Sequence, residues 1–418
     1  MIPAMLLALL LTQAPPKEEK KPVYQALVGG DLQTVTQGLL KGGTLLIKDD
    51  KILKIGPAVE LPEGTVRIDV SGKRVLPGFV AAWARNVGLT PSAGKIADAL
   101  DPFSESIKLA LAGGITSVYV EPSSGGGGVF GGNPPTAGPG AVIKMSYGSL
   151  DGMLLAEPAG VSLATWITGS PSERFDVRDN LTKARAALDK ERDYDQRRSD
   201  NKLKPDEKPP RASGLVETYV KLLKGDLAAR IPAPHVDELR RALELINEFH
   251  FKAVLTDVIE GWTMADEIGR ARAYCIVEVR AKEHAPRDAV RPAGSSIQQA
   301  ALLRKAGVKF AILPPNAGVG TGGTAGRDLL TLPLDGAFAI RGGLDEQTAL
   351  EAITITAAEI CGVDGRVGSL EEGKDADIVV LDGDPFDYRT FVDLTFVNGK
   401  LLYEKSTSPY FSHLKKTR

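Results

Sequence analysis

The most informative segment of the sequence is Val75-Leu76-Pro77-Gly78-Phe79-Val80-Ala81-Ala82-Trp83-Ala84-Arg85-Asn86-Val87-Gly88-Leu89. Its Pro-Gly pair predicts a tight turn, and the apolar run that follows is typical of a buried strand. Trp83 and Arg85 stand at the end of this run, where side chains can leave the core. The segment therefore predicts a core strand that ends at a functional surface.

Downstream of this strand, predicted strands and helices alternate. Short apolar runs alternate with segments whose apolar residues recur every three to four positions. This alternation favours a parallel α/β fold, so we predict a TIM-type (β/α)8 barrel with functional residues at the carboxyl ends of its strands. The predicted strands are 115–120, 140–145, 253–255, 274–279 and 308–313, and the predicted helices are 107–112, 236–249, 297–305 and 345–358.

Both ends of the chain carry shorter strand patterns. Residues 44–48 and 51–55 flank Asp49-Asp50, which is a hairpin signal, and strand patterns return at 376–381 and 395–403. We therefore predict a small β-sandwich module built from both chain ends. The expected boundaries are a leader and spacer over 1–21, the module over 22–75 and 365–405, the barrel over 76–364, and a tail over 406–418.

Two segments interrupt the barrel pattern. Ser123 to Gly140 is rich in glycine and proline and is predicted to be a long loop. A charged insertion at about 175–212 is densest between Asp189 and Lys208. We interpret it as a solvated helix or a mobile insertion rather than a binding element.

The composition limits the function classes. The 418 residues carry a formal net charge of −2 with both signs mixed, so no basic field favours nucleic acid. No apolar run of about 18 residues follows the N-terminus, which excludes a multi-span membrane protein. Met1 to Ala14 fits the apolar region of a signal peptide, so we expect a periplasmic or secreted protein. An uncleaved anchor or an apolar tail is the alternative, because no basic residue precedes the run.

Cysteine and histidine are scarce. Cys275 and Cys361 form no metal spacing and no disulfide framework, so we expect two buried free thiols, with a bridge between them as the alternative. No two histidines have the spacing of paired metal ligands. The four histidines are His235, His250, His284 and His413.

Three C-terminal motifs, at 352–360, 366–380 and 382–386, carry a resemblance to a known family. With the Pro-Gly and apolar segment at 77–85, they resemble the amidohydrolase superfamily and in particular its imidazolonepropionase-like branch. The resemblance covers the chain after the leader. It implies a barrel that hydrolyses C–N or related bonds in small substrates, with water activated by zinc or another divalent metal.

The ligands that this resemblance implies are missing. The family's first strand ends in Asp-x-His-x-His, and those positions hold Ala81, Trp83 and Arg85. The strand-five His-x-His falls on residues 232–234, and the strand-six histidine falls on Asp257. We therefore expect no bound metal.

Two further family positions also lack ligands. The strand-four position falls on Lys144, which cannot hold a metal alone, and the strand-eight aspartate falls near Pro315, beside Asn316. An amide is a poor proton acceptor. His235 lies one residue out of register with strand five, so its side chain should point away from the barrel centre.

We expect a charged cluster at the barrel mouth, made of Arg85, Glu121, Lys144 and Asp257. One interpretation is a binding site left over from the metal centre. The other is structural: Arg85 or Lys144 pairs with Asp257 or Glu121, because a buried unpaired charge is costly. In both, Trp83 fills space that imidazole and metal would occupy.

Other catalytic chemistry has few candidates. The glycines at 318–323 match G-x-G-x-x-G, but no helix start is clear among them, so a mouth loop is favoured over a dinucleotide site. No Gly-x-Ser-x-Gly nucleophile motif occurs. His284 follows a predicted strand on the mouth side and joins Asp257 as a catalytic candidate.

The sequence thus predicts an amidohydrolase-related protein without metal ligands, acting as a non-catalytic binding or partner subunit. The expected partner is a small molecule or an active amidohydrolase homologue. The alternative is an active amidohydrolase that cleaves non-peptide C–N bonds of a small substrate. Its rebuilt site would use His284, Glu278 and Asp257.

Overall fold

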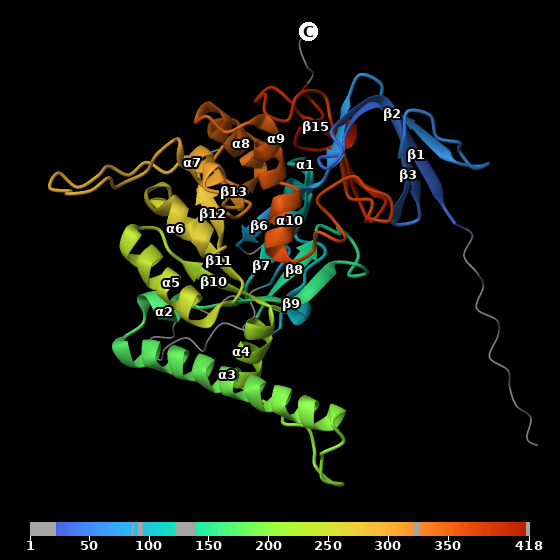
Figure 1. Cartoon of the computed structure of the whole chain (residues 1–418). Helices are drawn as coiled ribbons and strands as arrows, with labels where there is room; N and C mark the ends of the chain where they lie inside the picture. Colours follow the sequence, from blue (N-terminus) through green and yellow to red (C-terminus); the bar gives the residue numbers. More distant parts are fainter. Residues whose placement is uncertain (1–21, 86, 91–94, 123–138, 321–325, 415–418) are drawn as a thin grey trace, which may run out of the picture.

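The computed structural model describes residues 22–85, 87–90, 95–122, 139–320 and 326–414. The predicted leader and nearly all of the glycine-rich loop lie outside these ranges. Within them, no helix is both long enough and apolar enough to cross a membrane. The chain forms two sheets, one curled into a barrel and one built from both chain ends (Figure 1).

The barrel is an eight-stranded sheet whose strands follow one another in sequence order. They are β6 (Phe79–Ala84), β7 (Ile115–Val120), β8 (Gly140–Lys144), β9 (Leu154–Ser162), β10 (Ala228–Pro232), β11 (Ala253–Val258), β12 (Tyr274–Glu278) and β13 (Phe310–Leu313). The first strand, β6, and the last, β13, lie beside each other, so the sheet is nearly closed. This confirms the predicted TIM-type barrel.

One barrel strand runs against the others. β8 pairs antiparallel with both neighbours, so Lys144 lies opposite Ser117 near the start of β7, and Ala141 lies opposite Val120 at its end. The connection from β8 to β9, residues 145–153, is shorter than the dozen or so residues that a parallel crossover needs. The carboxyl end of β8 is therefore at the base of the barrel, away from the mouth.

Helices pack around the outside of the barrel (Figure 1). α5 shows why they form, since Val236, Leu239, Leu243 and Ile246 recur at helical spacing and are all buried. The helices are α1 (Glu105–Ala112), α2 (Ala164–Thr168), α5 (Val236–Phe249), α6 (Ala265–Arg270), α7 (Gln299–Lys305), α8 (Leu332–Arg341), α9 (Glu346–Ala352) and α10 (Ile355–Cys361), with short 3-10 turns η1 (Ile96–Ala99), η2 (Gly261–Met264), η3 (Leu329–Thr331) and η4 (Lys405–Thr407).

The helix predicted over 345–358 is two helices, α9 and α10. The chain leaves helical geometry at Thr354, whose hydroxyl donates to the Leu350 carbonyl at 2.6 Å. The break frees the carbonyl of Ile353, which accepts a hydrogen bond from the Val80 amide at 2.9 Å. Contact with the first barrel strand therefore explains the interruption.

The charged insertion forms a long helix, α3 (Pro171–Ser199), followed by α4 (Leu215–Lys224). Pro171 occupies the first turn, and Ser170 and Glu173 form a capping box. α3 lies outside the barrel strands along the lower edge of Figure 1 and packs against α4. Most of its surface is polar, which agrees with the predicted solvated helix.

The second sheet joins the two chain ends. Its strands are β1 (Tyr24–Gln33), β2 (Leu39–Lys48), β3 (Lys51–Gly56), β4 (Val66–Asp69), β5 (Arg74–Pro77), β14 (Ile378–Leu381), β15 (Val392–Val397) and β16 (Lys400–Glu404). β14 pairs antiparallel with β5, so Ile378 lies opposite Pro77. The module predicted from both ends is therefore present, and β5 leads from it directly into barrel strand β6.

Lys144 lies between the two sheets, so its predicted position at the mouth is wrong. The reversal of β8 carries its side chain to the base of the barrel, where it is fully buried. Its Nζ lies 2.6 Å from Asp375 Oδ2, 3.0 Å from Asp377 Oδ1 and 2.6 Å from Asn398 Oδ1. These acceptors belong to the C-terminal part of the module, so Lys144 fastens the barrel to it.

Lys144→Met should destabilise the protein by about 3–5 kcal/mol, because it removes the cation that pairs with the buried Asp377 and one of the three that pair with Asp375, the others being Lys51 and Arg366. The matched control is Lys51→Met. Lys51 also bonds Asp375, but its side chain is 41% exposed, so we expect a loss of about 1 kcal/mol or less. Urea unfolding at pH 7 measures both, and equal losses would contradict the anchoring role of Lys144.

Candidate functional site

The carboxyl ends of β6, β11, β12 and β13 enclose a small cavity at the mouth of the barrel. Its volume is about 100 Å³. This is the end of a TIM barrel that carries functional residues. The lining residues are Trp83, Arg85, Thr256, Asp257, Ile276, Glu278, Leu313, Pro314, Pro315, Asn316 and Ala317.

Trp83 and Arg85 form the wall contributed by the first strand. The Arg85 amide donates to the Ala317 carbonyl at 2.8 Å, which ties the end of β6 to the segment after β13. The Arg85 guanidinium carbon lies 5.4 Å from the centroid of the Trp83 ring, a cation–π distance.

Arg85 does not form the ion pair predicted from the sequence. Among the described residues, no ion pair joins it to Asp257 or Glu121, and its side chain is exposed. A guanidinium at a strand end can rest on an aromatic face while its charge stays in water. The mouth therefore keeps one exposed cation.

Two acids, Asp257 and Glu278, also line the cavity. Burial raises the pKa of Glu278 to about 7, and the negative charge of Asp257 adds to the shift. Asp257 has a φ of 58°, a left-handed conformation that is uncommon for residues other than glycine. Its Oδ2 accepts a hydrogen bond from the Thr256 hydroxyl at 2.9 Å. The prediction of Asp257 as a site residue was based on sequence position, whereas Glu278 entered only in the alternative site.

Below the mouth, the barrel centre holds a guanidinium that the sequence analysis missed. Arg230 projects from β10 and is 2% exposed. Its Cζ lies 3.3 Å from the centroid of the Tyr119 ring, and its Nη1 donates to the Ala82 carbonyl at 2.7 Å. The available signal was a charged residue inside the short apolar strand Ala228–Pro232.

Glu121 belongs to this inner group. It follows β7 and is half-buried, and its carboxylate lies 3.4 Å from the Tyr119 hydroxyl. Burial raises its pKa, while the Arg230 charge acts in the opposite direction and the Asp257 charge acts in the same one. Glu121 therefore links the buried cation to the acids at the mouth, whereas Lys144 lies at the other end of the barrel.

The histidines lie outside the mouth cavity. His284 is exposed in the connection between β12 and α7 and does not line the cavity. His235 caps α5, and its Nδ1 lies 3.7 Å from Glu283 Oε2 and 3.9 Å from Glu260 Oε2. The structure thus brings Asp257 and Glu278 together without His284.

The described part of the glycine motif, residues 318–320, does not open a helix. Gly318 lies in the connection after β13, where its amide donates to Asn316 Oδ1 at 3.0 Å, and α8 begins only at Leu332. Residues 321–325 lie outside the described chain. A dinucleotide site would need a helix that starts at the glycines, so the mouth-loop interpretation fits this geometry better.

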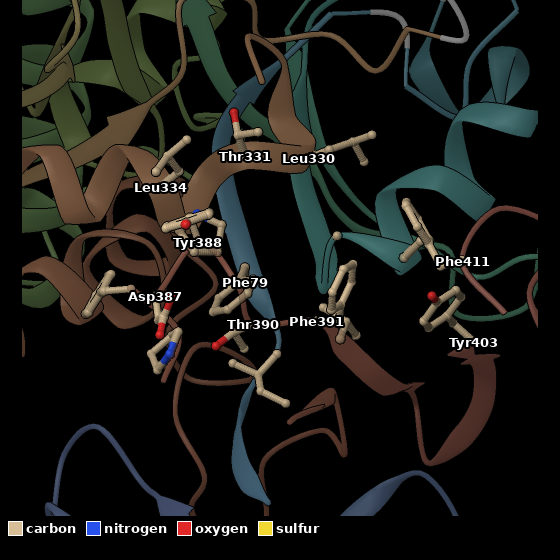
Figure 2. A pocket seen from close by; sticks show the side chains of 17 residues that line it. Phe79, Leu330, Thr331, Leu334, Asp387, Tyr388, Thr390, Phe391, Tyr403 and Phe411 are labelled. Carbon is tan, nitrogen blue, oxygen red and sulfur yellow. The ribbon is translucent and has the colours of Figure 1, made fainter. Parts of the chain in front are cut away.

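A larger cavity, of about 240 Å³, lies between the start of β6, the start of α8 and the C-terminal strands. Figure 2 shows that aromatic rings, including Phe79, Phe391 and Phe411, surround it. Its lining has one carboxylate, Asp387, which is bonded to Arg389 at 2.6 Å. This cavity offers apolar contact but no acid–base pair, so the mouth remains the candidate site.

The residues at the mouth do not fit the metal of the family. The first-strand positions hold the indole of Trp83 and the guanidinium of Arg85. Neither group offers a lone pair that could coordinate a metal ion, and the positive charge of Arg85 would repel one. Among the described residues, no group of three or more His, Cys, Asp or Glu side chains is arranged to hold a metal.

Sequence comparison relates the C-terminal part of the chain to hydrolases. A sequence model of the Amidohydrolase family matches residues 240–402. The imidazolonepropionase of Thermoplasma volcanium is 41% identical over 66 residues. That match spans 14% of this chain and 16% of the enzyme, so it covers only a small part of either.

Solved structures share the fold over most of the chain. An amidohydrolase from Thermotoga maritima MSB8 is 24% identical with a TM-score of 0.67, and the alignment covers 91% of this chain and all of that one (100%). A β-aspartyl dipeptidase from Fervidobacterium islandicum AW-1 is 12% identical with a TM-score of 0.56, covering 95% and 99%. At these identities the likeness concerns the fold. Together, the family match relates residues 240–402 to the Amidohydrolase family, and the structural likeness shows that the described chain has the fold of the amidohydrolase superfamily.

Proposed function

We propose that this protein is a non-catalytic, metal-independent member of the superfamily that binds a small molecule in the cavity at the mouth of the barrel. The observation that carries the proposal is the wall formed by Trp83 and Arg85. The resemblance assigns two metal ligands to these positions, and here their side chains line a cavity. Such a protein would still bind molecules at the mouth of the barrel, but it would not carry out the chemistry that needs a metal.

The buried Arg230 supports the proposal. Its guanidinium supplies a fixed positive charge to the barrel centre beside Tyr119, with Glu121 in electrostatic range. A guanidinium remains protonated in proteins, and unlike a metal ion it does not coordinate a water molecule. It can balance nearby carboxylates, but it cannot lower the pKa of a water molecule as zinc does.

The rival function is hydrolysis by a rebuilt site. Glu278, with a pKa of about 7, is suited to act as a general base, and Asp257 lies in the same cavity. General-base catalysis contributes roughly 10²–10⁴-fold. Enzymes usually need about 10⁶-fold or more, so the two carboxylates alone fall short.

The first test measures metal content. The full chain should carry well below one metal ion per molecule by elemental analysis, both as purified and after incubation with zinc or manganese followed by gel filtration. The reason is that the mouth lacks a set of side chains that could coordinate a metal ion. Stoichiometric metal that survives gel filtration would overturn the proposal, as would amide hydrolysis by the wild type that Glu278→Gln abolishes.

A second test uses pH. The pKa of Glu278 in the folded chain, about 7, lies above its ordinary value of 4.5, so the folded state holds this proton more tightly. Glu278 therefore reduces stability as pH rises from about 4.5 to about 7. Glu278→Gln should remove this contribution, so the variant gains stability relative to wild type across that window.

Thermal unfolding at several pH values measures the difference between the two proteins. Glu217→Gln is the matched control, because it makes the same chemical change at an exposed site on α4. Its difference from wild type should stay nearly constant with pH. If the stability difference between Glu278→Gln and wild type is the same at pH 4.5 and pH 8, Glu278 is not held in the cavity as described.

A further inference from the structure

The acids at the mouth have no fixed cation of their own. Among the described residues, neither Asp257 nor Glu278 takes part in an ion pair within 4.0 Å, although both line one cavity. Each places a negative charge near the other, as the effect of Asp257 on Glu278 shows. Two carboxylates and one guanidinium, that of Arg85, line the cavity, so the cavity carries a net negative charge once Glu278 is ionised, above about pH 7.

The nearby cations are already engaged. Arg280, just after β12, donates to both carboxylate oxygens of Asp335 at 2.7 and 3.0 Å. Arg230 bonds the Ala82 carbonyl inside the barrel. Arg85 lies over the Trp83 ring at the exposed rim. None of these three guanidinium groups is ion-paired with the acids of the cavity.

The remaining polar groups fit the same charge pattern. The Thr256 hydroxyl donates a hydrogen bond to Asp257, and this bond holds the carboxylate in place. Asn316 contributes an amide to the lining. Trp83 contributes an aromatic ring, a group that attracts organic cations, and the Arg85 guanidinium lies over that ring. A volume of about 100 Å³ corresponds to roughly three water molecules in the liquid, so only one end of a ligand fits inside.

We infer that the ligand of the mouth cavity carries a protonated amine or a guanidinium, which enters between Asp257, Glu278 and Trp83. This inference rests on the proposed binding function and specifies the ligand class. The positive group of the ligand takes the electrostatic place of the family's metal. Arg85 at the rim would favour ligands whose outer end is neutral or negative over those with a second cation.

The experiment titrates the full chain with ethylammonium chloride and methylguanidinium chloride, and follows tryptophan fluorescence at constant ionic strength. Sodium acetate and acetamide are the anionic and neutral probes. The cations should give a saturable change that Trp83→Phe removes. Asp257→Asn and Glu278→Gln should each weaken binding at least about tenfold, since each deletes a charge-assisted contact. Glu217→Gln should bind like wild type.

Three results would overturn the inference: no saturation by either cation, equally tight binding of acetate or acetamide, or unchanged cation affinity in both acid variants. Thermal melting of the variants at pH 8 verifies that they are folded. Equally tight acetate or acetamide binding would leave the proposed binding function intact and change only the ligand class. The proposed function fails by a separate measurement, the stoichiometric metal described above.

Discussion

The buried ammonium of Lys144 holds the two sheets together. It reaches Asp375, Asp377 and Asn398, so each of its three N–H groups has an acceptor. A lysine buried without such partners would be very costly, and so would Asp377 without the lysine, whereas Asp375 would keep Lys51 and Arg366 as partners. The barrel and the C-terminal strands are therefore coupled, because separating them would expose or strand these charges.

The same interaction shows which features of the fold could be predicted from the sequence and which could not. The Pro-Gly start of β6 and the C-terminal motif with Asp375 and Asp377 were sufficient for the fold, since they are local patterns tied to definite places in it. The direction of β8 was not predicted, because an apolar run looks the same in both directions. Only the short connection at 145–153 carried that information, and it moves Lys144 to the base of the barrel.

The candidate site was predictable in part for a similar physical reason. Side chains at the ends of parallel strands meet at one face, and Arg85 and Asp257, both expected at the mouth, line one cavity there. Arg230 was missed because its role depends on what lies across the barrel, namely the Tyr119 ring and the Ala82 carbonyl. The catalytic role of His284 was overestimated, because its position after a strand does not tell how far the connection between β12 and α7 carries it from the mouth.

The charges inside the barrel are arranged in a way that suits binding better than hydrolysis. A catalytic metal supplies a positive charge that polarises a substrate directly and activates water at the same point. Here the buried charge belongs to Arg230, which is held against Tyr119 below the mouth and does not line the cavity. The acids face the cavity instead, and Asp257 and Glu278 repel each other there. An incoming cation would relieve that repulsion, whereas a neutral amide would gain little from it, so the proposed cationic ligand depends on these two carboxylates.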